Sequence, residues 1–123
     1  NRLSMLLAVL HRHAAVAMYD QDVFVNVAGG VRITETAADL PVLLAVLSSL
    51  RDRPLPADLA AFGEVGLSGE VRPVPNGLVR IQEAAKHGLR RLVCPYANAP
   101  KKPPEGAEII PVRRLADALA VLD

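Results

Sequence analysis

Hydrophobic positions recur along the chain with two periods, which predict alternating helices and strands. Leucines spaced by three or four positions predict amphipathic helices over residues 2–13 and 38–50. Shorter apolar runs at residues 14–19 and 23–27 predict two strands. The acidic segment 20–22 between these runs is typical of a hairpin tip.

The helix expected over residues 38–50 has the widest apolar face in the sequence, so we expect it to be the buried central helix. Thr36 or Asp39 would cap its first turn, since both side chains can accept from free helical N–H groups. Pro41 is tolerated only in a first turn and therefore favours Asp39 as the cap.

The stretch from residue 59 to residue 95 organises the rest of the chain. Two Gly-Glu-Val tripeptides flank Gly66-Leu67-Ser68, which predicts a hairpin. Asn76 is expected to cap a following helix that Gly88 ends. The next short strand, at residues 92–94, is expected to run parallel to the strand before this helix.

The last part of the chain predicts a Pro- and Lys-rich loop at 96–106, a strand at 108–111 and a helix at 113–122. The complete pattern predicts an α/β fold, a mixed sheet with packed helices, in a single domain over residues 1–123.

Composition narrows the possible environments of the chain. Its 123 residues fit one domain, and 51% are hydrophobic against 22% charged. The single cysteine, Cys94, excludes an intrachain disulfide and favours a reducing, cytoplasmic compartment. No apolar run approaches the ~20 residues of a membrane span, so no membrane partner is expected. Because the first residue is Asn1, we expect the chain to be part of a longer protein.

Four segments together carry a resemblance to a known family. They are MYDQDVFVNVAGGVRITETAADL, SSLRDRPLP, FGEVGLSGEVRPVP and PYANAPKK, in order along the chain. They resemble the C-terminal Lon-protease-like domain of the bacterial RadA/Sms DNA repair proteins. The resemblance implies a Lon proteolytic-domain-like fold and assembly of the chain with itself into a ring, expected to be hexameric. It also implies that an ATPase domain of the longer protein lies outside this chain.

A Lon-type protease uses a serine and a lysine as nucleophile and general base. In this chain the serine position falls on Ala37 and the lysine position on Leu78, or on Val79 with one inserted residue. None of these side chains can attack a carbonyl or carry a proton, so we expect no enzyme activity and no catalytic residues.

Other chemical signals are weak. The three histidines, His11, His13 and His87, lack a spaced set of further ligands, so no metal site is expected. No G-x-x-x-x-G-K-[ST] motif is present, and Gly29-Gly30 reads more simply as a turn than as a phosphate cradle, so no cofactor is expected in this domain.

The basic residues are unevenly distributed. Residues 86–102 contain five Lys or Arg and no Asp or Glu, although the net charge of the chain is only +1. Together with two arginines after the central helix they predict a surface that binds the phosphates of double-stranded DNA. The predicted DNA-binding residues are Arg51, Arg53, Lys86, Arg90, Arg91, Lys101 and Lys102.

The sequence therefore leaves three functional hypotheses. The first, which the resemblance implies, is a non-catalytic DNA-binding and oligomerisation module of a DNA repair and recombination ATPase that acts in branch migration. The second is a peptidase-derived domain that binds peptides without cleaving them, and the third is a pure assembly scaffold.

Overall fold

The computed structural model describes Met5 and residues 36–122 of the chain. The elements expected before residue 35, with His11, His13 and the Gly29-Gly30 pair, lie outside the described residues. The described elements are η2 (Thr36–Ala38), α2 (Asp39–Arg51), β1 (Leu59–Ala61), β2 (Glu64–Val65), β3 (Val71–Arg72), α3 (Gly77–Lys86), β4 (Arg91–Pro95), η3 (Tyr96–Asn98), β5 (Glu108–Val112), α4 (Leu115–Leu119) and η4 (Ala120–Leu122), where η marks a 3-10 helix.

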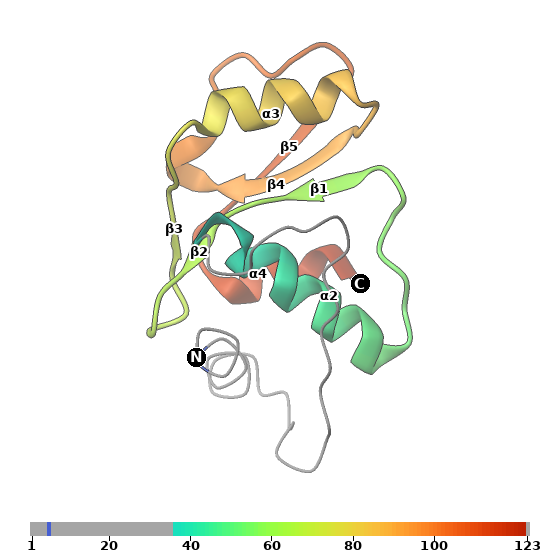
Figure 1. The fold of residues 1–123 in the computed structure, drawn as a ribbon, viewed down its shortest axis with the longest axis vertical. Helices are drawn as coiled ribbons and strands as arrows, with labels where there is room; N and C mark the ends of the chain where they lie inside the picture. Colours follow the sequence, from blue (N-terminus) through green and yellow to red (C-terminus); the bar gives the residue numbers. More distant parts are fainter. Residues whose placement is uncertain (1–4, 6–35, 123) are drawn as a thin grey trace.

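Three of the strands form a parallel sheet in the order β1-β4-β5 (Figure 1). Arg91 at the start of β4 is opposite Leu59 of β1 and Glu108 of β5, so the three strands begin at one edge of the sheet. The expected α/β class is confirmed, because helices pack on this sheet.

The central strand β4 is buried on both faces. Val93 belongs to a core cluster with residues of α2 and α4, whereas Leu92 and Cys94 belong to a second cluster with Ile81 of α3. Figure 1 shows this arrangement as three layers, with α3 on one side of the sheet and α2 and α4 on the other. Burial of both faces explains why β4 is a continuous apolar run rather than an alternating one.

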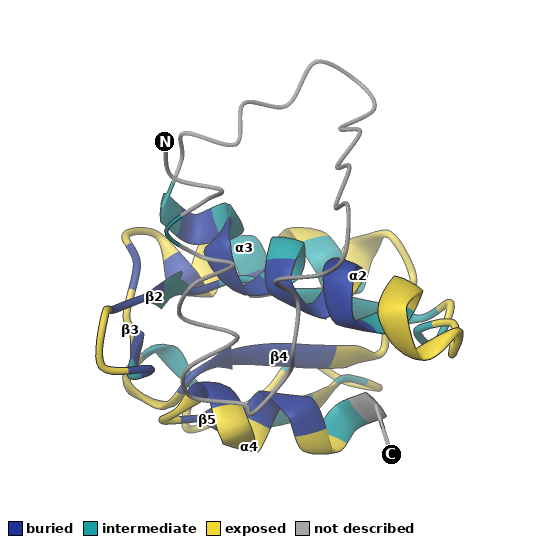
Figure 2. Ribbon diagram, turned by 90° about the horizontal axis from the view of Figure 1, so that it is seen from below, coloured by how far each residue is buried: buried dark blue, intermediate teal, exposed yellow. Residues whose placement is uncertain are grey.

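The expectation of a buried central helix is confirmed. Leu40, Leu43 and Leu47 of α2 have no exposed surface, and Figure 2 shows most of this helix buried apart from its exposed C-terminal end. Leu50, at the end of the leucine stripe, is 38% exposed, so the buried face ends before the helix does. Pro41 lies in the first turn, as its missing N–H requires.

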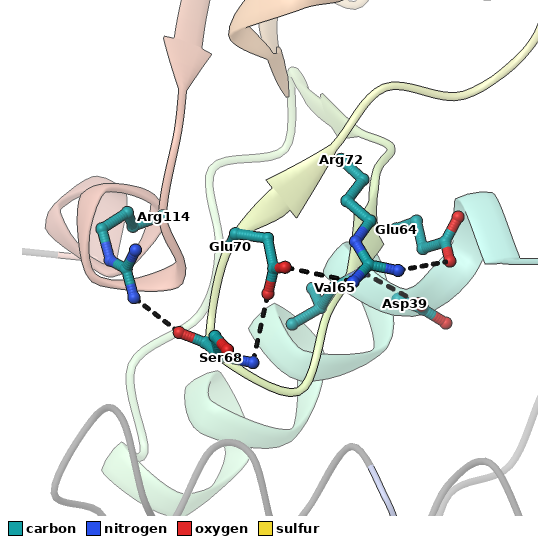
Figure 3. Close-up of polar contacts among 7 residues, drawn as sticks. All are labelled: Asp39, Glu64, Val65, Ser68, Glu70, Arg72 and Arg114. Atoms are coloured by element: carbon teal, nitrogen blue, oxygen red, sulfur yellow. Dashed lines mark hydrogen bonds and ion pairs between the residues drawn. The ribbon is translucent and has the colours of Figure 1, made fainter.

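Neither α2 nor α3 has the side-chain N-cap hydrogen bond that the sequence predicts. Asp39 is the first residue of α2 rather than its N-cap, which is Ala38. The Asp39 carboxylate instead accepts a hydrogen bond from the backbone N–H of Val65 in strand β2, at 3.0 Å (Figure 3).

Asn76 does occupy the N-cap of α3, but its backbone is left-handed, with φ 62°, and its side chain makes no capping hydrogen bond. Asparagine suits this position because it tolerates the left-handed region better than most residues.

The central stretch forms the expected hairpin but not the expected parallel pair. Strands β2 and β3 are antiparallel, and the N–H of Gly69 donates to the carbonyl of Gly66 at 3.0 Å to close the turn. The expectation that the strand after α3 runs beside the strand before it is wrong, because β4 pairs with β1. The hairpin is a separate two-stranded sheet, and the N–H of Val71 in β3 donates to the carbonyl of Arg113 at 2.8 Å.

The last strand and helix are close to their predicted ranges. The strand β5 contains the expected residues 108–111. The final helix begins at Leu115 instead of residue 113, because the Asp117 carboxylate accepts the N–H groups of Arg113 and Arg114 at 3.2 Å each and caps the chain there.

Asp39 provides a test of how the hairpin is held on the core. In the variant Asp39→Ala the buried N–H of Val65 loses its acceptor, which costs about 1–3 kcal/mol of unfolding free energy. Asp39→Asn keeps a side-chain oxygen and should recover part of this loss. Urea denaturation followed by circular dichroism measures both. A stability of Asp39→Ala equal to that of the parent would show that this bond does not stabilise the fold.

Candidate nucleic-acid interface

All seven cations predicted to bind DNA are exposed, and the fold distributes them over four segments. Arg51 ends α2 and Arg53 follows it, Lys86 ends α3, Arg90 and Arg91 enter β4, and Lys101 and Lys102 lie in the loop between η3 and β5.

Five of these cations share one side of the molecule. We define the amino edge as the edge of the sheet at which β1, β4 and β5 begin. Arg90 and Arg91 lie at this edge, where their backbone N–H groups donate to the carbonyl of Asp58 at 2.9 and 3.1 Å. Figure 1 shows the C-terminal ends of α2 and α3 on the same side, on opposite faces of the sheet. Arg51 and Arg53 therefore lie on the same side as Lys86 but across the sheet from it.

The two loop lysines follow a different path. The loop starts at η3, where Asn98 bonds to both backbone groups of Val74, and returns to the amino edge, where the N–H of Glu108 donates to the carbonyl of Arg90 at 2.6 Å. Figure 1 shows this loop crossing the outer side of α3. Lys101 and Lys102 thus lie on the α3 side of the molecule, between the two edges of the sheet.

Folding brings carboxylates close to two of the predicted cations. Arg91 Nε lies 3.7 Å from Asp58 Oδ1, and Lys86 Nζ lies 3.5 Å from Glu83 Oε1. The segment 86–102 contains no Asp or Glu in the sequence, but in the folded chain two of its cations have carboxylate neighbours from outside the segment.

Four of the predicted cations have no such neighbour. Within the described part of the chain, no carboxylate lies within 4.0 Å of Arg53, Arg90, Lys101 or Lys102. Arg90 lines a shallow depression of about 250 Å³ together with Glu105, yet the two do not form an ion pair. These four residues are the strongest candidates for contacts with an anionic partner.

The two positions of a Lon-type dyad have contrasting environments. Ala37 is only 5% exposed, and its carbonyl accepts the N–H of Gly63 at 2.9 Å. Leu78 and Val79, in the first turn of α3, are 52% and 55% exposed. Cys94 has no exposed surface, and burial raises the pKa of its thiol to about 11, so it remains protonated at neutral pH.

A polar cluster that the sequence did not predict surrounds the β2–β3 turn (Figure 3). The Glu70 carboxylate accepts the N–H of Ser68 and a guanidinium N–H of Arg72, each at 3.1 Å. Arg72 also lies 3.7 Å from Glu64, and Arg114 donates to the carbonyl of Ser68. The backbone N–H of Glu70, and next the Arg72 side chain, hold the pKa of the Glu70 carboxyl below its ordinary value of 4.5.

An aromatic contact was also missed in the sequence. The guanidinium carbon of Arg113 lies 4.0 Å from the centre of the Tyr96 ring, a cation–π distance. Tyr96 follows β4 and Arg113 follows β5, so the contact lies at the edge of the sheet where the strands end. Only the pairing of β4 with β5 could have indicated it.

The described residues contain no group of three or more His, Cys, Asp or Glu side chains that could hold a metal ion. In the same part of the chain, no helix is both long and apolar enough to cross a membrane.

With this geometry established, comparison with known proteins assigns the family. Residues 6–98 match the family model described as subunit ChlI of Mg-chelatase, which is most of the chain. The chain belongs to this family. This ChlI-family chain is also homologous to proteins named DNA repair protein RadA.

The relatives match nearly the whole chain. DNA repair protein RadA of Escherichia coli and that of Salmonella typhimurium are each 68% identical to it over 123 residues, covering 100% of this chain. DNA repair protein RadA of Aquifex aeolicus is 46% identical over 122 residues. The ChlI-family chain spans about a quarter of the length of these relatives, 27% in each case. The expected relationship to RadA proteins is confirmed.

The lowered pKa of Glu70 predicts a pH-dependent contribution to stability. A depressed folded-state pKa means that ionised Glu70 stabilises the fold above about pH 4.5 and that this contribution is lost as the pH falls through the lower folded value. Thermal melts should therefore show Glu70→Gln less stable than the parent at neutral pH, and the difference should shrink in acid. Glu105→Gln, in an exposed loop, is the matched control and should show no such pattern. A difference between Glu70→Gln and the parent that is independent of pH would contradict the assignment.

Proposed function

We propose that this chain is a non-catalytic DNA-binding and oligomer-forming module of a DNA repair protein, and that it contacts the phosphates of double-stranded DNA. The observation that carries the proposal is a set of exposed cations that have no carboxylate neighbour among the described residues: Arg53, Arg90, Lys101 and Lys102. The names of the relatives, DNA repair protein RadA, supply the biological setting.

The placement of these cations suits contact with a phosphate backbone. They lie after a helix, before a strand and in a loop, and none of the four is within a described helix. Phosphate contacts fix position but read no sequence, so the module binds duplexes with little sequence preference.

Lys86 and Arg91 contribute to the same surface in a weaker way. Their ion pairs with Glu83 and Asp58 are solvent-exposed, with the Lys86 side chain 73% and the Arg91 side chain 50% exposed. Exposed pairs of this kind contribute roughly 0–1 kcal/mol, so a phosphate can replace or share the carboxylate at small cost.

The proposal includes a Lon-protease-like ancestry without proteolysis. The dyad positions hold Ala37 and Leu78, or Val79, and the first of these is buried while the other two are exposed on α3. No described pair of side chains at these positions can generate a nucleophile. The module needs no cofactor of its own, and it acts in the cytoplasm as part of a recombination ATPase that drives branch migration.

Assembly into a hexameric ring is the second half of the proposal. Leu67, Leu78 and Val79 are large apolar side chains that are more than half exposed. Contact with a neighbouring copy would remove them from water. A ring would also place several copies of the cationic surface on one DNA molecule, so that weak contacts add up.

Fluorescence anisotropy with labelled duplex DNA tests the DNA surface. Replacing Arg90 by Ala should weaken binding about tenfold, because a charge-assisted hydrogen bond is lost. Arg72→Ala removes the same charge from a residue already paired with Glu64 and Glu70, and should leave affinity nearly unchanged.

Two further variants make this test sharper. Asp58→Asn removes the carboxylate beside Arg91 and should tighten duplex binding. The combined Arg90, Lys101 and Lys102 alanine variant should bind weakly to every duplex, whatever its sequence. Equal affinities for the parent and this combined variant, with both folded, would place the DNA surface elsewhere.

The absence of proteolysis has a direct test. Neither Ala37 nor Leu78 can act in peptide hydrolysis, so the chain should produce no fragments from unfolded casein over many hours. Cleavage that follows the chain through successive purification steps would refute a non-catalytic role.

A further inference from the structure

We propose that Tyr96 and Arg113 form a binding site for one unpaired base of single-stranded DNA, at the edge of the sheet opposite Arg90 and Arg91 of the proposed duplex surface. The site extends the proposed DNA-binding function to a second form of DNA and uses none of the cations assigned to the first.

The geometry of the pair leaves room for a base. The Arg113 guanidinium covers one face of the Tyr96 ring, 4.0 Å from its centre. Tyr96 nevertheless remains 54% exposed. With one face covered by the guanidinium, this exposure means that much of the rest of the ring is open to solvent. Its sequence neighbour Ala97 is also exposed and too small to shield it.

The backbone segments that carry Tyr96 and Arg113 are anchored by hydrogen bonds. Tyr96 begins the short helix η3, and Asn98 at the end of that helix accepts from the N–H of Val74 at 2.9 Å and donates to its carbonyl at 3.1 Å. Arg113 is fixed through its backbone, since its carbonyl accepts the N–H of Val71 and its N–H donates to Asp117. A ring held on a rigid scaffold loses little conformational freedom when a base stacks on it.

Arg113 adds a charge that suits a nucleotide. Within the described residues its guanidinium has no carboxylate within 4.0 Å, so it can meet a phosphate adjacent to the stacked base. Asp117 and Glu70 lie nearby, but Asp117 caps the start of α4 and Glu70 is bonded to Ser68 and Arg72. Because these nearby carboxylates repel phosphates, we expect the site to bind a single stacked nucleotide and not a longer stretch of the strand.

The site is separate from the duplex surface. From Arg91 to Pro95 the strand β4 advances about 13 Å, at 3.3 Å per residue. Arg90 and Arg91 are at the start of β4, whereas Tyr96 lies beyond its end. Substitutions at one edge should leave the other intact.

Binding of fluorescein-labelled oligo(dT) to the 123-residue chain tests the proposal. Stacking of one base on an aromatic side chain contributes about 1–3 kcal/mol, so Tyr96→Ala should weaken binding roughly fivefold to a hundredfold. Tyr96→Phe keeps the ring and should bind like the parent, whereas Tyr96→Leu keeps an apolar side chain without a ring and should bind like Tyr96→Ala. Arg113→Ala should weaken oligo(dT) binding. It should also make the slope of log affinity against log salt concentration shallower than in the parent.

Tyrosine emission gives a second readout, because the chain has no tryptophan and only two tyrosines. In a Tyr19→Phe background Tyr96 is the sole tyrosine, and its emission should be quenched as oligo(dT) binds. Loss of single-strand affinity in Tyr96→Ala with unchanged duplex affinity supports the site. Retention of full oligo(dT) affinity in folded Tyr96→Ala, or unquenched emission on binding, overturns it. If the combined Arg90, Lys101 and Lys102 alanine variant leaves duplex binding intact while Tyr96→Ala abolishes oligo(dT) binding, the duplex proposal fails and this one stands.

Discussion

The two-sided burial of strand β4 is the constraint on which the rest of the structure depends. Val93 packs toward α2 and α4 while Leu92 and Cys94 pack toward α3, so the strand must lie between two helical layers. A parallel sheet buried in this way exposes only its two ends and its lateral edges. The proposed contact residues Arg90 and Arg91 accordingly lie where β4 begins, and Tyr96 lies where it ends.

The hydrogen bonds at the two ends of the parallel strands differ: backbone groups form them where the strands begin, and a side chain forms them where the strands end. At the amino edge Arg90 and Arg91 donate backbone N–H groups to the carbonyl of Asp58, and both arginine side chains are exposed, that of Arg91 in an ion pair with the Asp58 carboxylate. Where the strands end, side chains hold the backbone together. Asn98 pairs with both backbone groups of Val74, much as a neighbouring strand would, and a Cβ on Gly77 would lie 2.6 Å from Asn98 Nδ2. Glycine at position 77 thus leaves space for this contact.

Much of the fold followed from local patterns in the sequence. The leucine spacing of α2, the glycine-rich turn between β2 and β3, and the end of α3 before Gly88 each depend on residues close together in the chain. The pairing of β4 with β1 could not be predicted in this way, because the β2–β3 hairpin and α3 separate the two strands in the chain. Asp39 was assigned to a cap for the same reason, since its actual partner, Val65, is distant in sequence.

The candidate site shows the same division. The exposure of the seven cations followed from their chemistry, but their neighbours did not. Asp58 reaches Arg91 only because β1 and β4 pair, and Arg113 reaches Tyr96 only because β5 pairs with β4. Charge counted along the sequence missed the carboxylates beside Lys86 and Arg91, and aromatic residues counted along the sequence missed the contact between Tyr96 and Arg113.

The salt dependence of duplex binding tests the central claim most directly. Each phosphate neutralised by a protein cation releases counterions and adds about −0.9 to the slope of log affinity against log salt concentration. If Arg53, Arg90, Lys101 and Lys102 all contact phosphates, these four cations should contribute about −3.6 to the slope per bound chain, and the slope should become shallower by about that amount when all four are replaced by alanine. A slope near zero for the parent chain, or the same steep slope for the parent and the fourfold variant, would contradict the account.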